Sequence, residues 1–236
     1  MMRVRRPLLP ETLEADLALL EDRRLNERDK TTTQQWAWLT SAEKASLREQ
    51  LQSMTTGICR CMYCEDGEGT DIEHFFPKAT YPDKMFSWAN YLLACSNCNS
   101  NQKRNKFPLD QNGLPQLIDP SVDIPEEHIA LSPSTGEVVA RTERGKVSIA
   151  VFGLNRQVCI DGRKVAWTRL IQQLEYYSDH PERRDEVIAV ISKSPFAGVR
   201  NWMRWLIKRE ASELFGPDDW SRAMRFPEFF SEDGLD

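Results

Sequence analysis

The chain has 236 residues, of which 40% are hydrophobic and 28% are charged, and its formal net charge is −5. This composition is typical of a globular protein with a sizeable core, and no apolar run approaches the length that spans a bilayer. The acidic balance counts against tight binding of nucleic acid by this chain alone, because such binding draws on basic groups that displace counterions from phosphates. The basic first residues continue into Pro7 and Pro10 rather than into the apolar stretch of a secretion signal, so we expect a cytoplasmic protein.

Residues 1–56 are predicted to form a helical region. Apolar residues recur at helical spacing within 11–29, and a second helix is predicted to begin at Thr40. Thr40 and Glu43 have the spacing of a capping box, in which the hydroxyl and the carboxylate satisfy backbone donors at a helix start. We expect Trp36 and Trp38, just before this helix, to be packing anchors rather than a platform for stacked bases.

Two cysteine pairs dominate residues 57–108. Each has the spacing C-x-x-C, and the four residues are Cys61, Cys64, Cys95 and Cys98. Where thiols stay reduced, such pairs favour a structural Zn²⁺ held by four thiolates over disulfides; the alternative is four buried thiols without a ligand. Cys59 and Cys159 lie outside the two pairs, and we expect both to be ordinary buried thiols.

The segment between the cysteine pairs contains Asp71-Ile72-Glu73-His74-Phe75-Phe76-Pro77-Lys78, and the second pair continues directly into Asn99. Pro77 marks the end of a predicted strand. An imidazole near neutral pH can take a proton from water that attacks a phosphodiester, and carboxylate and amide oxygens can hold Mg²⁺ or Mn²⁺. The other interpretations of His74 are a core histidine or a zinc ligand.

The pleat of a strand raises a difficulty for this interpretation. Asp71 and Glu73 share one face of an extended strand, whereas His74 lies on the other. If Glu73 and His74 serve one site, the backbone must twist or leave extended geometry near Pro77.

Basic residues surround the same segment. They could hold phosphates next to the scissile bond without reading bases, and we expect four of them to do so: Lys78, Lys103, Arg104 and Lys106. Lys103 follows Asn99 by one helical turn, so the two side chains are expected to point the same way.

Residues 109–236 are predicted to contain a small β-hairpin and then helices. Ile129–Leu131 and Val138–Ala140 flank a turn that contains Gly136, and helical periodicity follows from about residue 146. We expect a long helix around residues 165–174, a short one around 187–191 and another over 198–214. The predicted fold class is α+β and mostly helical.

At the residues quoted above the chain resembles the HNH endonucleases, over about residues 59–106. The resemblance implies a ββα-metal (His-Me finger) core stapled by a four-cysteine zinc site, with helical additions on both sides. By the family pattern His74 is the general base, Glu73 is a ligand of the divalent ion, Asn90 braces the site and Asn99 takes the last position. The order here is H-N-N, and an amide oxygen in place of an imidazole favours Mg²⁺ or Mn²⁺ over Zn²⁺ or Ni²⁺. Asp71 stays open as a further ligand.

A second resemblance covers nearly the whole chain. The matching stretches are Arg6-Pro7, Ile72–Lys78, Asn90–Cys95, Asp119-Pro120 and Leu154-Asn155-Arg156. Together they look like the PtuB-type HNH subunits of Septu anti-phage systems, including relatives that accompany some retrons. That resemblance implies a PtuA-type ATPase partner and cleavage of invading nucleic acid, with DNA expected as the substrate. The alternatives are a zinc-stabilised binding or scaffold module without cleavage, and an HNH nuclease that acts on RNA such as tRNA.

Overall fold

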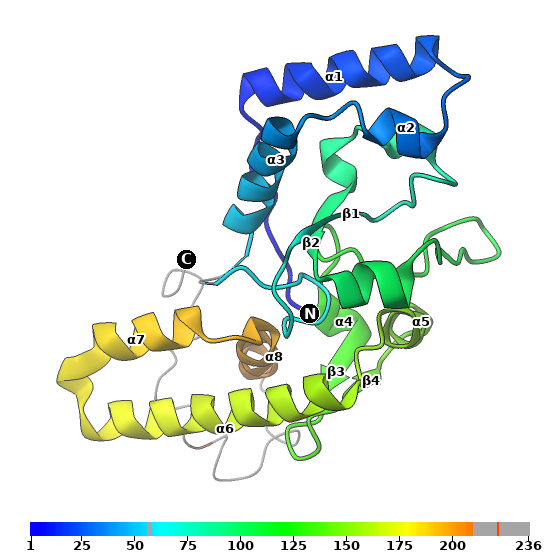
Figure 1. Cartoon of the computed structure of the whole chain (residues 1–236). Coiled ribbons are helices and arrows are strands. Elements are labelled where there is room, and N and C mark those ends of the chain that lie inside the picture. Colours follow the sequence, from blue (N-terminus) through cyan, green and yellow to red (C-terminus); the bar gives the residue numbers. More distant parts are fainter. Residues whose placement is uncertain (56–57, 210–220, 222–236) are drawn as a thin grey trace.

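The computed structural model describes residues 1–55, 58–209 and 221, and it arranges the predicted regions around one continuous apolar core. The centre holds a two-stranded antiparallel sheet, with three helices on the N-terminal side and a longer helical region on the C-terminal side (Figure 1). Within the described residues, none of the helices is both long and apolar enough to cross a bilayer.

The N-terminal helices are α1 (Glu11–Asn26), α2 (Thr32–Trp36) and α3 (Ser41–Ser53). The predicted first helix is confirmed but ends three residues early. The capping box is also confirmed: the Thr40 hydroxyl accepts a hydrogen bond from the Glu43 N–H at 3.2 Å, and the Glu43 carboxylate accepts one from the Thr40 N–H at 2.6 Å. Leu47 and Leu51 are fully buried, and α3 packs on the sheet.

Strands β1 (Asp71–His74) and β2 (Tyr91–Ala94) pair in antiparallel register, with Asp71 opposite Ala94 and His74 opposite Tyr91. Two short 3₁₀ turns, η1 (Pro82–Lys84) and η2 (Trp88–Asn90), fill the connection between the strands. All four residues of β2 are buried, which explains why Tyr-Leu-Leu-Ala reads as an apolar run rather than an alternating one. The second cysteine pair then leads into η3 (Asn97–Lys103), a helix of the wider π type.

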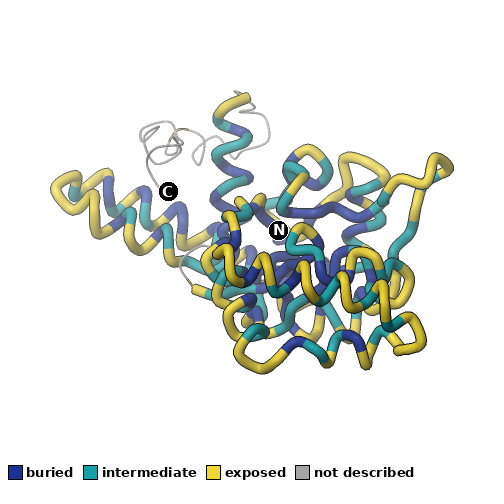
Figure 2. Tube along the Cα trace, turned by 90° about the horizontal axis from the view of Figure 1, so that it is seen from above, coloured by how far each residue is buried: buried dark blue, intermediate teal, exposed yellow. Residues whose placement is uncertain are grey.

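The C-terminal region begins with the short helix α4 (Pro125–His128) and the predicted hairpin, formed by β3 (Ile129–Leu131) and β4 (Val138–Ala140). Four helices follow: α5 (Glu143–Phe152), α6 (Gln157–Asp179), α7 (Arg184–Lys193, after the 3₁₀ turn η4, Pro181–Arg183) and α8 (Ala197–Lys208). Residues 210–214 of the last predicted helix lie outside the described residues. Figures 1 and 2 show α6 and α7 running alongside each other and extending away from the rest of the chain.

We expect Thr40→Ala to lower the free energy of unfolding by about 1 kcal/mol, because the first turn of α3 loses the acceptor for its Glu43 N–H. Urea unfolding followed by circular dichroism measures this change. Thr168→Ala is the matched control, because Thr168 is exposed in the middle of α6, where it caps nothing. Equal stabilities of the two variants would contradict the capping role.

Candidate metal centre and active site

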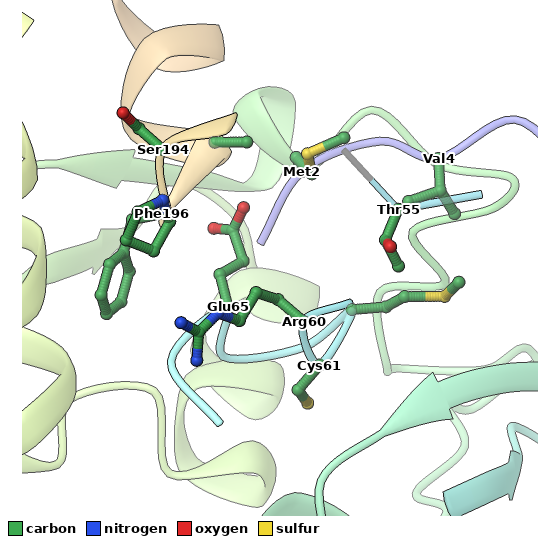
Figure 3. A pocket seen from close by; sticks show the side chains of 11 residues that line it. Met2, Val4, Thr55, Arg60, Cys61, Glu65, Ser194 and Phe196 are labelled. Carbon is green, nitrogen blue, oxygen red and sulfur yellow. The ribbon is translucent and has the colours of Figure 1, made fainter. Parts of the chain in front are cut away.

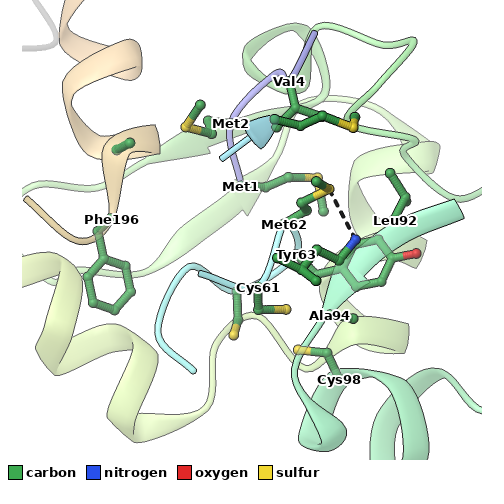
Figure 4. Close-up of a cluster of buried hydrophobic side chains, with 14 of the residues drawn as sticks. Met1, Met2, Val4, Cys61, Met62, Tyr63, Leu92, Ala94, Cys98 and Phe196 are labelled. Carbon is green, nitrogen blue, oxygen red and sulfur yellow. Dashed lines mark hydrogen bonds between the residues drawn. The ribbon is translucent and has the colours of Figure 1, made fainter. Parts of the chain in front are cut away.

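The four cysteines of the two C-x-x-C pairs converge in the core. Their sulfur atoms all lie within 4.8 Å of one another, and the four residues are buried. Figure 4 shows Cys61 and Cys98 in the buried cluster beneath β2, near Met62, whose sulfur accepts the Leu93 N–H at 3.3 Å. Four sulfurs at this separation could hold a metal ion such as zinc in tetrahedral geometry.

A tight turn forms the first cysteine pair. The Cys61 N–H donates to the Gly67 carbonyl at 2.9 Å, and the Cys61 carbonyl accepts the Glu65 N–H. A Cβ on residue 67 would lie 2.8 Å from the Cβ of Cys95, so only glycine lets the two cysteine turns approach this closely. Glu65 has a positive φ of 62°, and its carboxylate accepts the Gly198 N–H at 2.7 Å, which joins this turn to the start of α8.

Arg156 contacts the sulfur cluster from outside, a contact that sequence reasoning did not assign. Both guanidinium Nη atoms lie 3.9 Å from the Cys98 sulfur, and Nη1 also donates to the carbonyls of Phe152 and Gly153 at 2.8 and 2.9 Å. The only signal in the sequence was the Leu154-Asn155-Arg156 stretch of the resemblance. A cation beside four thiolates compensates negative charge that a divalent metal leaves unbalanced.

The two cysteines outside the cluster differ from each other. Cys159 is buried, as predicted, whereas Cys59 is only half-buried, so that prediction was wrong for Cys59. The backbone carbonyl of Cys59 accepts the Gly69 N–H at the edge of the first cysteine turn.

Strand β1 directs its two carboxylates at η3. The Asn99 amide nitrogen donates to Oδ2 of Asp71 at 3.0 Å, and the Lys103 ammonium lies 2.5 Å from Oε1 of Glu73. Asp71 and Glu73 therefore share a strand face, and Asn99 and Lys103 share a helix face, as their spacings predicted. Ser96 also donates to Asp71, at 3.3 Å.

Glu73 and Lys103 form a buried ion pair. Lys103 is 0% exposed, and its ammonium also donates to the His74 carbonyl at 2.8 Å. Burial raises the pKa of the Glu73 carboxyl above its ordinary value, and the Lys103 ammonium opposes this rise. Lys103 thus lies beneath the surface and cannot contact a phosphate in this conformation, unlike the exposed Arg104 and Lys106.

His74 points to the opposite side of β1. Its Nε2 lies 3.1 Å from the Met85 carbonyl, and its ring meets Trp36 and Tyr91 edge-on at centroid distances of 4.5 and 5.1 Å. Burial, together with the nearby Lys78 ammonium, lowers the pKa of His74 to about 3. The imidazole is therefore neutral near pH 7. The pleat thus places the side chains of His74 and Glu73 on opposite faces of β1. The Lys103 ammonium contacts both residues, because it bonds the His74 carbonyl and the Glu73 carboxylate.

Asn90 braces the backbone after β1. Its side-chain oxygen accepts the Phe76 N–H at 2.7 Å, and its nitrogen donates to the carbonyls of Phe76 and Lys84, both at 3.0 Å. With three bonds to backbone atoms, this buried amide fixes the segment that leaves His74 and the turn that precedes β2.

The oxygen donors around β1 and η3 suit a hard divalent cation. The Asp71 carboxylate faces the Asn99 amide, the Glu73 carboxylate on the same strand face pairs with Lys103, and in the described part of the chain no hydrogen bond reaches the side-chain oxygen of Asn99. The Lys103 ammonium at Glu73 marks a place arranged to hold positive charge. The donor set therefore fits Mg²⁺ or Mn²⁺ in chemistry.

Two pockets lie away from His74. A small one separates the N-terminal segment from the first cysteine turn and Phe196; Figure 3 shows the Glu65 and Arg60 side chains beside it. A cleft of about 930 Å³ lies between α6 and the segment that runs from α7 into α8. Neither is lined by the polar groups of β1 and η3.

Comparison with known proteins gives three matches, two of which share one name. Septu protein PtuB of Bacillus thuringiensis is 30% identical over 118 residues, which are 50% of this chain and 43% of that protein. Septu protein PtuB of Bacillus mycoides is 31% identical over 153 residues, with 51% of each chain covered. Protein ea31 of Escherichia phage lambda is 34% identical over 65 residues, 27% of this chain and 21% of that protein. No protein-family model matches the chain.

Two of the matched proteins carry the name Septu protein PtuB. The chain is related to the Septu proteins of the PtuB type, as its sequence motifs predicted. It spans about half the length of the curated relatives it matches.

We expect the stability of the chain to fall as the pH is lowered from about 6.5 towards 3, partly through His74. In this window the unfolded chain takes up a proton on this imidazole, whereas the folded chain, with a His74 pKa of about 3, does not. His74→Phe keeps an aromatic ring under Trp36 but removes this proton. Urea unfolding between about pH 7.5 and 5 should give a shallower decline for the variant, and parallel declines would contradict the lowered pKa.

We expect Arg156→Gln to release a bound metal ion faster, by about tenfold, because the Cys98 sulfur loses its cationic neighbour. Release to a chromogenic chelator measures the rate, and circular dichroism establishes that the variant is folded. Arg169→Gln, at an exposed position of α6, is the matched control. Equal release rates for the two variants would remove Arg156 from the metal centre.

Proposed function

We propose that the chain is a metal-dependent endonuclease of the HNH type and the nuclease component of a Septu-type anti-phage complex. One observation carries this proposal: a four-residue strand presents two carboxylates to Asn99 and Lys103 on η3 and ends in a neutral, buried imidazole. The four-cysteine cluster at the start of η3 supports a ββα-metal core stapled by Zn²⁺. The relationship to PtuB proteins supports the defence context.

In this proposal His74 is the general base. The Met85 carbonyl can only accept, so Nε2 of His74 carries the hydrogen and Nδ1 keeps the lone pair that takes a proton from water. In the covered conformation burial lowers the pKa of His74, which keeps Nδ1 unprotonated at neutral pH but also makes it a weaker base than an exposed imidazole. Asn90 is a positioning residue, because its three backbone bonds hold the segment after His74. The products would carry 3′-hydroxyl and 5′-phosphate ends.

Glu73 and Asn99 would hold the Mg²⁺ or Mn²⁺ ion, with Asp71 as a further ligand. When bound, the ion stabilises negative charge on the leaving oxygen. Lys103 pairs with the buried Glu73 and opposes the rise that burial gives to its pKa. Asp71 accepts a hydrogen bond from the Asn99 side-chain nitrogen, which turns the Asn99 side-chain oxygen away from Asp71. Arg104 and Lys106, exposed just after η3, and the half-buried Lys78 would contact phosphates.

The proposed substrate is DNA and the proposed partner is a PtuA-type ATPase. The partner would add affinity for the DNA phosphates, which a chain with a net charge of −5 binds weakly by itself. We propose that both act in the cytoplasm. An HNH nuclease acting on RNA such as tRNA uses the same residues, since water activation by His74 needs no 2′-hydroxyl.

One observation favours a second candidate, a zinc-stabilised binding or scaffold module without cleavage. The Lys103 ammonium already neutralises Glu73, so the carboxylate is satisfied without a divalent ion. This candidate predicts zinc in the purified protein but no Mg²⁺-dependent nicking, with or without the ATPase.

His74→Ala should keep its zinc and its fold but lose cleavage of plasmid DNA in Mg²⁺ by at least about a hundredfold, because the general base is gone. The assay is run with and without the partner ATPase, and elemental analysis follows the zinc. His128→Ala is the matched control, since among the residues that the structure describes the His128 ring bonds the Thr142 hydroxyl at 2.9 Å, away from β1. Undiminished cleavage by His74→Ala would remove His74 from the mechanism. Wild-type protein that never nicks DNA or RNA would favour the scaffold module.

A further inference from the structure

The N-terminal helices place one aromatic ring directly on His74. Trp36 ends α2, and its ring centroid lies 4.5 Å from that of the imidazole at an interplanar angle of 76°. The same indole contacts Phe86 at 6.2 Å and Tyr91 at 5.8 Å. Trp36 itself is half-buried, so it forms the outer cover of an imidazole that is only 5% exposed.

Two lysines from different elements face this indole. The ammonium of Lys44, in the first turns of α3, lies 5.7 Å from the Trp36 ring centroid, and that of Lys78, four residues after His74, lies 5.6 Å from it. Within residues 1–55, 58–209 and 221, neither ammonium lies within ion-pair distance of a carboxylate. Both are half-buried and both have the ring face as their partner.

Positive charge therefore exceeds negative charge around His74. The ammonium groups of Lys78 and Lys103 both act on His74, and the one carboxylate that acts on Lys78, Glu73, already pairs with Lys103. Burial and the repulsion from Lys103 and Lys44 lower the pKa of Lys78, while Glu73 opposes this change. A half-buried cation pair held only by a π face is expected to bind an anion, because charge-assisted hydrogen bonds to phosphate are stronger than cation–π contacts at accessible sites.

We propose that Lys44 and Lys78 form a binding site for backbone phosphates of the nucleic acid, and that phosphate binding draws both ammonium groups off Trp36, which frees this indole to move aside and uncover His74. The inference rests on the proposed function and deepens it, since it assigns part of the substrate site to α2 and α3, outside the HNH-like segment. It also supplies a reason for the cover: the imidazole meets water only when a phosphate strand is present.

The test measures binding rather than cleavage. Fluorescence anisotropy of a labelled DNA duplex of about 20 base pairs, and of the matching RNA duplex, is recorded without added Mg²⁺ over a range of salt concentrations. Lys44→Gln and Lys78→Gln are compared with Lys193→Gln, an exposed lysine at the end of α7 with no contact to this region. The chain is used both alone and with its ATPase partner.

Each site variant should bind about five- to tenfold more weakly at about 0.1 M salt and lower the slope of log K against log salt by about 1, whereas Lys193→Gln should change neither. Wild-type affinity and slope in both site variants would overturn the proposal, even if the protein cleaves DNA. Weaker binding in a chain that never cleaves would uphold the phosphate site while the nuclease proposal fails.

A second measurement follows the contact between the Trp36 ring and the His74 imidazole. In nitrogen-15 histidine spectra, the His74 resonances should shift when the duplex binds, because the imidazole leaves the ring current of Trp36. The doubly substituted Lys44→Gln, Lys78→Gln chain should lose that shift at duplex concentrations that still saturate it. Unmoved His74 resonances on the saturated wild-type chain would overturn the uncovering of His74.

Discussion

Four sulfur atoms in one small volume are the constraint on which the rest of the site depends. A cation such as Zn²⁺ among these sulfurs would balance four thiolate charges and would tie together the turn at Cys61, the end of β2 and the start of η3. The Arg156 guanidinium adds a positive charge from the turn between α5 and α6. The cluster thereby fixes where η3 begins, and with it the positions of Asn99 and Lys103.

Alternation along β1 then divides the chemistry between two sides of the sheet. One side joins Asp71 and Glu73 to η3, and the other gives His74 to the aromatic cover supplied by α2. Lys103 connects the two, since its ammonium binds the Glu73 carboxylate and the His74 carbonyl. The electrostatics of both sides are thus coupled through one buried cation, although the side chains diverge.

Features with local causes could be predicted from the sequence. The capping box at Thr40, the β3–β4 hairpin, the cysteine convergence and the shared face of Asn99 and Lys103 each depend on spacing along a short segment. The cover of Trp36 on His74, the burial of Lys103 against Glu73 and the contact of Arg156 with Cys98 depend instead on residues far apart in the chain. No periodicity encodes such contacts, because tertiary packing decides them. The alternation of side chains along a strand predicted that Glu73 and His74 point to opposite faces of β1. The sequence did not predict that η3 is a helix of the π type.

The shortness of β1 has a consequence for how the chain could diverge. In a pairing of only four residues, slippage by one position would exchange inward and outward side chains, sending the imidazole towards η3 and the carboxylates into the aromatic cluster. Asn90 is hydrogen-bonded to the backbone of Phe76 and Lys84, and so it opposes that misalignment at the end of the pair where the connection joins the two strands. Homologues should therefore keep the number of residues from Asp71 to Pro77 constant, while the irregular stretch after Lys106 can lengthen or shorten freely.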